Sequence, residues 1–132
     1  CPQVLPVLTE LARDGWRLAV CTNKPEAAAR ALLQAVGLLP LLSAVGGGDQ
    51  FPGRKPDPCH LLGTLALAAG EPAASVMLGD HHNDMVAASA AGVPAIFAAW
   101  GYGPPAMADG GAAIAHTIKE AAAIANRLLP VG

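Results

Sequence analysis

The sequence predicts an α/β protein, a Rossmann-like three-layer α/β/α sandwich with a parallel sheet. Two observations predict this class. Short apolar runs alternate along the chain with longer segments in which apolar residues recur at helical spacing. Polar residues and glycines follow most of the apolar runs, as expected of buried strands that end at a functional edge. Strands that alternate with helices form right-handed crossovers, so we expect helices on both faces of the sheet.

The helices are predicted from their periodicity and from the residues at their ends. Gly15 and Gly37 suit the left-handed ends of the first two helices, and Pro25 suits the first position of the second. Asp57 followed by Pro58 suits the start of the third. The expected elements are, in order, a helix over 2–15, a strand over 17–22, a helix over 25–37, a strand over 43–47, a helix from 57 to 70, a strand over 75–79, a helix from 83 or 84 to 92, strands over 94–100 and 111–115, and a helix over 117–129.

The composition indicates a single domain over residues 1–132. The chain is 53% hydrophobic and 14% charged, with a formal net charge of −2. No basic block indicates a nucleic-acid partner, and no apolar run approaches the ~20 residues that span a membrane. Three cysteines without a CxxC pair favour a reduced, cytoplasmic setting. The chain starts with Cys-Pro instead of Met, from which we expect that the natural start is missing, and nothing in it indicates an oligomeric state.

Ligands of parallel α/β sheets bind at the carboxyl ends of the strands. Four polar segments follow the predicted strands: CTNK, GGGDQ, GDHHND and AAWGYG. They are far apart in the sequence, yet we expect them to meet at one edge. Trp100 and Tyr102 in the last segment either line a pocket there or cover the edge of the sheet.

Asp80 and Asp84 are candidate metal ligands. Mg²⁺ prefers one or two carboxylates, several waters and a substrate phosphate oxygen. Alternatively, Asp84 is an acid favoured by the helix dipole in the first turn and Asp80 is a loop residue. His81 and His82 are adjacent and no third ligand lies at zinc spacing, so we expect both to face solvent or the edge of a substrate.

Thr22, Asn23 and Lys55 are candidate phosphate ligands. Thr22 offers a hydroxyl and Asn23 an amide at the start of a helix, which favours an anion site, although a simple helix cap is the alternative. Prolines stiffen the loop around Lys55, and lysine binds phosphate as a point charge, although a surface lysine is the alternative. We expect Lys24 and Arg54 to be solvated.

His60 lies in the first turn of a predicted helix, where we expect a packing or surface residue.

The candidate phosphate and metal ligands are more specific as a set than singly, because a hydroxyl, an amide, a lysine and two acids can together hold a phosphate and Mg²⁺. That equipment is typical of phosphoryl transfer, in which catalysis is mainly positioning and charge neutralisation.

These segments resemble the motifs of the haloacid dehalogenase superfamily of phosphatases. Its second motif is similar to VCTNKP, its third to RKPDP and its fourth, GDxxxD, to GDHHND. The resemblance implies catalytic roles for Thr22 and Lys55, phosphate binding by these two and Asn23, and Mg²⁺ binding by Asp80 with support from Asp84. The TNKP, KPDP, AAGVP and WGYG segments are most similar to phosphoglycolate phosphatases, which implies a small phosphorylated metabolite as the partner.

The first motif of that superfamily is absent from this sequence. It is a strand that ends in DxD, whose first aspartate becomes the aspartyl-phosphate and whose second acts as general acid and base. The chain has no DxD pair and no helical cap, so we expect a partial catalytic core that is inactive by itself. Because the missing strand lies mid-sheet in the family, we expect two unpaired strand edges or their closure.

The leading functional hypothesis is Mg²⁺-dependent hydrolysis of small phosphate monoesters, with 2-phosphoglycolate as the favoured substrate of the full-length protein. The alternative from another class is a non-catalytic phosphate-binding remnant. A phosphotransferase or mutase of the same fold is a third possibility. The sequence does not fix the substrate, since in this branch of the superfamily the cap does most of the selecting.

Overall fold

The computed structural model describes residues 4–99 and 113–129, and its strands are all parallel. Trp100 and Tyr102, for which the sequence left open a place in a pocket or over the edge of the sheet, lie outside these residues. The elements are, in order, α1 Val4–Arg13, β1 Leu18–Cys21, α2 Glu26–Ala35, a 3₁₀ helix Leu39–Leu41, β2 Leu42–Gly46, α3 Pro58–Leu67, a 3₁₀ helix Pro72–Ala74, β3 Met77–Gly79, α4 His82–Ala91, β4 Ala95–Ala98, β5 Ala113–Ala115 and α5 Ile118–Leu128.

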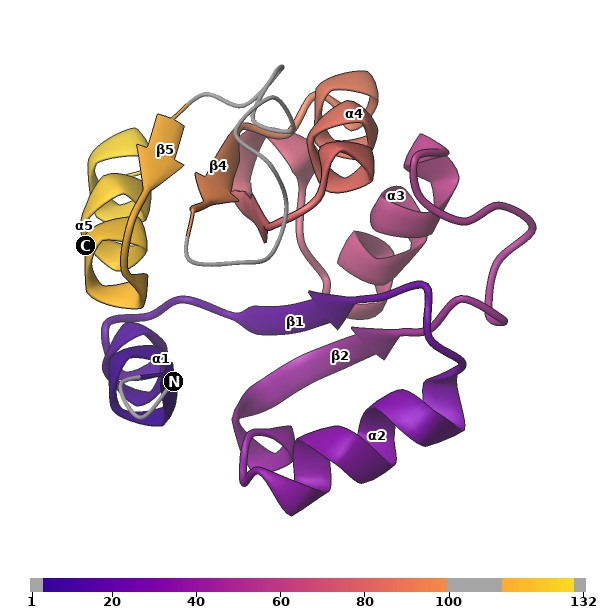
Figure 1. Cartoon of the computed structure of the whole chain (residues 1–132), viewed down its shortest axis with the longest axis horizontal. Coiled ribbons are helices and arrows are strands. Elements are labelled where there is room, and N and C mark those ends of the chain that lie inside the picture. Colours follow the sequence, from indigo (N-terminus) through magenta and orange to yellow (C-terminus); the bar gives the residue numbers. More distant parts are fainter. Residues whose placement is uncertain (1–3, 100–112, 130–132) are drawn as a thin grey trace.

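The strands form two separate parallel sheets. One consists of β1 and β2, and the other has the order β3-β4-β5. Helices α3 and α4 cover one face of the strands, and α2 and α5 cover the other, with α1 beside α5 (Figure 1). The expected parallel strands with helices on both faces are therefore confirmed. Among the described residues, β1 and β3 each have only one strand partner, which matches the expected pair of unpaired edges.

The predicted helix ends are confirmed where a side chain or a glycine closes the backbone locally. The Asp57 carboxylate accepts a hydrogen bond from the Cys59 amide at 2.8 Å and begins α3. Thr117 begins α5 in the same way. Gly92 ends α4 with a φ of 74°, in the left-handed region that glycine occupies without steric cost.

Three predicted helix ends are wrong. Helix α4 begins at His82 and not at Asn83 or Asp84. Pro25 is not the first residue of α2 but precedes it in an extended conformation, and the first helical amide, that of Glu26, donates to the Asp49 carboxylate at 2.8 Å. Helix α3 ends at Leu67 instead of reaching Gly70, and Ala69 takes the left-handed conformation, with a φ of 56°. The two 3₁₀ helices were not predicted.

Helices and side chains hold the two sheets together. Helix α3 packs on β1, β2 and α4, and Cys21 of β1 packs against the larger core cluster. The Arg17 guanidinium donates to the carbonyls of Ala68 and Ala69 at the end of α3, at 3.2 and 3.0 Å. That core cluster consists of Leu61, Met77, Met85, Ala88, Val93, Ala95 and Phe97, and the smaller one of Ile96, Ala115, Ala121 and Ile124.

The carboxyl ends of β1 and β3 therefore lie near each other although no hydrogen bonds join the strands.

Among the helices that the structure describes, none combines the length and the apolar character that crossing a membrane requires.

Candidate active site

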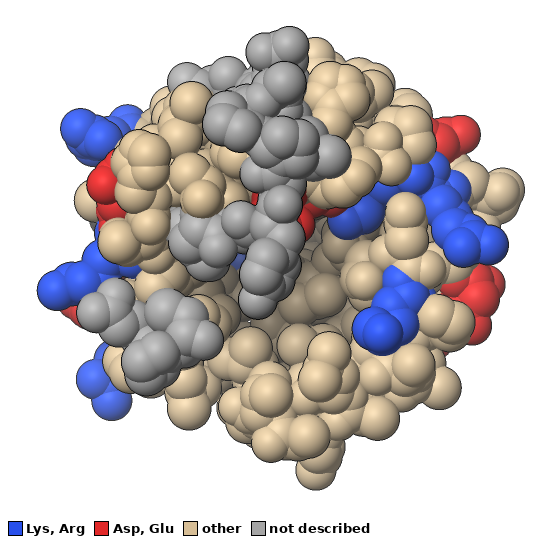
Figure 2. Space-filling view, in the orientation of Figure 1, with Lys and Arg blue, Asp and Glu red and all other residues tan. Residues whose placement is uncertain are grey.

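A pocket of about 360 Å³ lies between the carboxyl ends of β1 and β3. This volume falls within the range of about 300–1,000 Å³ that is typical of small-ligand sites. The face drawn in Figure 2 is hollowed near its middle, and acidic and basic side chains lie along the edge of the hollow. The pocket is lined by Cys21, Thr22, Lys55, Met77, Leu78, Gly79, Asp80, Asp84 and Ala98.

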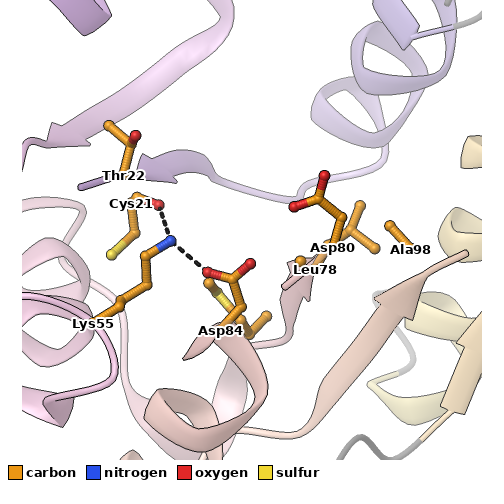
Figure 3. Close-up of a pocket in the computed structure, with 9 residues that line it drawn as sticks. Cys21, Thr22, Lys55, Leu78, Asp80, Asp84 and Ala98 are labelled. Carbon is orange, nitrogen blue, oxygen red and sulfur yellow. Dashed lines mark hydrogen bonds and ion pairs between the residues drawn. The ribbon is translucent and has the colours of Figure 1, made fainter. Parts of the chain in front are cut away.

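Thr22, Lys55, Asp80 and Asp84 all line this one pocket. Figure 3 shows Thr22 and Lys55 on one side of the space and Asp80 on the other, with Asp84 between them. The expected convergence of these four side chains is therefore observed. The roles assigned to them as catalytic, phosphate-binding and metal-binding residues stay predictions.

Lys55 is held in the pocket by two oxygen atoms. Its ammonium group donates to the Asp84 carboxylate at 2.5 Å and to the Cys21 carbonyl at 2.9 Å (Figure 3). The side chains of Lys55 and Asp84 are 11% and 8% exposed, so water screens the pair only weakly. Lys55 is thus not the surface lysine that was the alternative, but a cation fixed at the wall of the pocket.

The two acids of GDHHND differ in their surroundings. Asp84 is buried, and its second carboxylate oxygen accepts a hydrogen bond from the His81 amide at 3.3 Å. Asp84 therefore supports the start of α4 and the position of Lys55 at once. Asp80 is exposed at the pocket, and no hydrogen bond or ion pair of its carboxylate is seen among the described residues.

The donor set at this edge fits a hard cation such as Mg²⁺. Asp80 supplies one accessible carboxylate, which is enough for an ion that keeps several waters and takes a further oxygen from a substrate. Asp84 would act through Lys55 or a water, since both of its oxygens already have partners. Within residues 4–99 and 113–129, no three His, Cys, Asp or Glu side chains gather as a larger metal cluster.

Asn23 has a different environment from Thr22. Its side-chain amide donates to the Lys55 carbonyl at 3.3 Å and accepts from the Lys55 amide at 3.2 Å. Asn23 does not line the pocket, so the structure places this amide against the backbone of Lys55. The Thr22 hydroxyl accepts from the Lys24 amide at 3.2 Å, which also gives it the local turn role considered as its alternative.

The histidines of GDHHND are both exposed, as expected. The imidazole Nδ1 atom of His81 accepts a hydrogen bond from the Asn83 amide at 3.1 Å and so caps the start of α4. Lys24 and Arg54 are exposed, in agreement with their expected solvation. His60 is completely buried, which confirms a packing position and excludes a surface one.

Sequence reasoning missed the contribution of Cys21. Its carbonyl holds Lys55 and its residue lines the pocket, but a backbone carbonyl leaves no signal in the sequence. Burial raises the pKa of the Cys21 thiol above its usual value of 9.0, and the negative charge of Asp84 acts in the same direction. A hydrogen bond with Thr64 and the charge of Lys55 oppose this rise without cancelling it. The thiol is therefore protonated at neutral pH.

Known proteins share both the sequence and the fold. The family model of the haloacid dehalogenase-like hydrolases matches residues 1–98. A phosphoglycolate phosphatase of Mesorhizobium japonicum is 42% identical over 101 residues, which cover 76% of this chain and 44% of the relative. The crystal structure of a predicted phosphoglycolate phosphatase from Haemophilus somnus superimposes with a TM-score of 0.85 at 30% identity, covering 93% of this chain and 56% of that one.

The crystal structure of CbbY from Rhodobacter sphaeroides, in complex with phosphate, superimposes with a TM-score of 0.80 at 26% identity and covers 90% of this chain and 54% of that one. This chain spans less than half the length of the curated relatives that it matches first. The family match nevertheless covers most of its residues, including the strand ends that form the pocket. On this evidence, the chain belongs to the haloacid dehalogenase-like hydrolase family.

Proposed function

We propose that the whole protein hydrolyses small phosphate monoesters, with 2-phosphoglycolate as the favoured substrate. The observation that carries this proposal is the convergence of Thr22, Lys55 and Asp80 on one pocket at the carboxyl edge of parallel strands. A hydroxyl and an ammonium group bind phosphate oxygens, and a carboxylate binds the cation that balances them. Relatives named phosphoglycolate phosphatase support the choice of substrate.

Each residue has a proposed role in binding or charge neutralisation. The Thr22 hydroxyl donates to a phosphate oxygen, and the Lys55 ammonium neutralises the charge that gathers on the transferred group. Asp84 holds the Lys55 ammonium in place through their 2.5 Å contact. Asn23 contributes by holding the backbone of Lys55, which its two hydrogen bonds support.

Mg²⁺ is the proposed cofactor, held by Asp80, with Asp84 as support. When bound, it would supply positive charge and so reduce repulsion between the phosphate and an attacking carboxylate. The exposed carboxylate of Asp80 at the pocket supports this assignment. The thiols of Cys21 and Cys59, which form no disulfide, support a reducing, cytoplasmic setting for the reaction.

The proposed nucleophile is an aspartate that this sequence does not contain. Family resemblance assigns that role to a DxD pair at the end of a strand, and the unpaired edges of β1 and β3 support a place for such a strand. Its carboxylate would attack phosphorus, the ester oxygen would leave, and water would then hydrolyse the acyl phosphate. We therefore expect the 132 residues alone to have no turnover.

The test compares hydrolysis of p-nitrophenyl phosphate by two proteins, with and without Mg²⁺. One is the 132-residue chain, and the other is an extended chain in which the amino-terminal part of the Mesorhizobium relative precedes Cys1. Only the extended chain should turn over substrate. In it, Asp80→Asn and Lys55→Met should each lower kcat by about 10²–10³-fold, the usual cost of losing one electrostatic group. Lys24→Met, which removes an exposed lysine, is the matched control and should retain activity.

Turnover by the 132-residue chain would overturn the assignment of the nucleophile. Full activity of the Asp80→Asn variant would overturn the metal assignment. The alternative function is a non-catalytic phosphate-binding module, which would use the same Thr22 and Lys55 at the pocket. It predicts that the extended chain is also inactive, whereas inorganic phosphate binds the 132-residue chain and requires Thr22 and Lys55.

A further inference from the structure

We propose that His60 is a positioning residue. Its ring holds the backbone of Lys55 in place and thereby fixes the position of the Lys55 ammonium group in the pocket. The inference rests on the proposed function of Lys55 as a phosphate ligand. It comes from a buried imidazole that has no place in the proposed chemistry. His60 is completely buried and does not line the pocket, yet it contacts the backbone of a residue that does.

The two ring nitrogens of His60 face groups of opposite character. Nε2 lies 3.0 Å from the Gly46 carbonyl, at the end of β2, and Nδ1 lies 3.4 Å from the Lys55 amide. A carbonyl can only accept and an amide can only donate. Both contacts are satisfied by a single form of the ring, the neutral imidazole with its proton on Nε2. In this form, His60 connects the loop that carries Lys55 to a strand end at the base of the site.

Thr64 contacts the backbone of His60, and Phe51 contacts its ring. The His60 carbonyl accepts a hydrogen bond from the Thr64 hydroxyl at 2.9 Å, one turn further along α3. The Phe51 ring packs against the imidazole with a centroid distance of 5.6 Å and an angle of 44° between the planes. Gly63 leaves the space for Phe51, because a β-carbon there would overlap its ring. The imidazole is therefore a rigid support for the Lys55 backbone.

The Lys55 amide is shared between two acceptors, Asn23 Oδ1 at 3.2 Å and His60 Nδ1 at 3.4 Å. Asn23 approaches from the β1 side and His60 from α3. These two contacts join the Lys55 loop to both neighbouring elements. A shift of this backbone would move the ammonium group away from Asp84 and from the phosphate that it is proposed to bind.

A pair of variants separates the two contacts of the ring. His60→Asn keeps an acceptor near the Nδ1 position and loses the donor to Gly46. His60→Gln keeps a donor near the Nε2 position and loses the acceptor for Lys55. If His60 positions Lys55, His60→Gln should weaken the binding of inorganic phosphate by about three- to tenfold, the effect of one net hydrogen bond. His60→Asn should remain within about twofold of wild type in this binding measurement, even though its unfolding midpoint in urea falls.

A purely structural role predicts that phosphate affinity falls in proportion to lost stability, in both variants alike. That result would overturn the proposal, as would an unchanged phosphate affinity in His60→Gln. The Lys55→Arg variant, which keeps the charge but alters the side chain, provides a reference for a displaced cation at this position.

A spectroscopic measurement on the unmodified chain tests the same contact without relying on phosphate binding or on the folding of a variant. Long-range ¹H–¹⁵N NMR of the His60 ring at neutral pH should show a protonated Nε2 and an unprotonated Nδ1. A protonated Nδ1 would overturn the proposal. If the ring has the expected form but the unmodified chain binds no inorganic phosphate, the proposed function of the pocket fails and the His60–Lys55 contact stands.

Discussion

Lys55 and Asp84 form an ion pair that is nearly withdrawn from water, although both residues line the pocket. The backbone carbonyl of Cys21 provides Lys55 with a second acceptor, and the His81 amide provides Asp84 with a second donor. Such additional hydrogen bonds offset part of the free energy that is lost when two charges leave water. Removal of one partner then leaves the other charge poorly solvated.

We predict that Lys55→Met destabilises the chain by an amount near the lower end of about 3–5 kcal/mol, because the uncompensated Asp84 carboxylate can reach pocket water. The free energy of unfolding is measured by urea denaturation. Replacing Asp84 by Asn in the Lys55→Met background should recover part of the loss. Lys24→Met is the matched control and should stay within about 0.5 kcal/mol of wild type. Equal effects of the two lysine substitutions would contradict the buried pair.

The raised pKa of Cys21 predicts a dependence of stability on alkaline pH. Above about pH 9, the thiol loses its proton more readily in the unfolded chain, where its pKa is near 9.0, than in the folded one. The contribution of Cys21 to the free energy of unfolding is therefore fully present below pH 9 and falls as the pH rises through the pKa of the folded state. Compared with Cys21→Ala, the unmodified chain should lose stability more steeply as the pH rises above about 9 in urea denaturation. Parallel curves for the two proteins would refute this assignment.

The sequence predicted the residues of the pocket that lie directly after a strand or within a recognisable loop. Thr22 and Asp80 follow β1 and β3, so their meeting depends only on the parallel arrangement of the strands. The role of Cys21 depends on its carbonyl accepting from the distant Lys55 side chain, and that of His60 on its contact with the distant Gly46 carbonyl. No local pattern encodes such contacts. For Asn23 the sequence indicated the residue but not the backbone group that it contacts.

Among the elements, α3 packs closely against the end of β2. A β-carbon on Gly46 would overlap the hydroxyl of Thr64, and one on Gly47 would overlap the backbone of Glu26 at the start of α2. The absence of side chains at these glycines lets both helices pack against the end of β2. This packing fixes the position of the Gly46 carbonyl, which His60 contacts. Through His60 it also fixes the position of the Lys55 loop.

We predict that Gly46→Ala destabilises the chain by about 1–3 kcal/mol or more, because the added methyl group must displace Thr64 from its buried position. Thermal unfolding, followed by circular dichroism, should show a lower midpoint. Ser43→Ala, at an exposed position of the same strand, is the matched control and should change the midpoint little. Recovery of the midpoint in the Gly46→Ala, Thr64→Gly double variant would identify the overlap as the cause.

The helix starts at Asp57 and Thr117 were predicted well, since a common capping residue closes the first turn there. The start of α4 was placed too late, because its cap is a histidine, His81. The start of α2 was misplaced by one residue, because its first amide is capped by Asp49, which is distant in the sequence. The end of α3 was misplaced because Arg17, before β1, binds the carbonyls there and supports a left-handed Ala69 ahead of Gly70.

At the scale of the whole molecule, two sheets are joined by helices without hydrogen bonds between their nearest strands. The alternation of strands and helices predicted the parallel pairing and the helical layers on both faces (Figure 1). It could not predict which strands pair, because the order of strands depends on tertiary contacts. The division into two sheets was expected only from the resemblance, which implies another strand between β1 and β3.

We predict that hydrogen exchange distinguishes the open edges from the paired ones. Amides of β1 and β3 that are not bonded to β2 or β4 should exchange rapidly in the 132-residue chain, whereas those within the β3-β4-β5 sheet should be protected. In the extended chain described above, the open-edge amides should become protected by at least about tenfold if a strand enters between β1 and β3. Mass spectrometry of peptic fragments measures both. Unchanged exchange in the extended chain would show that its added residues do not occupy this place.

The separation of β1 from β3 also has a consequence for the handling of the isolated chain. The edges of β1 and β3 have unpaired backbone groups, and the half-exposed Leu78 lies beside them. Such edges can pair with an extended segment of another molecule. Backbone hydrogen bonding carries little sequence preference, so selectivity must come from the side chains of the arriving strand. At high concentration, the same open edges allow strands of neighbouring copies to pair, until a segment of matching shape occupies the gap between β1 and β3.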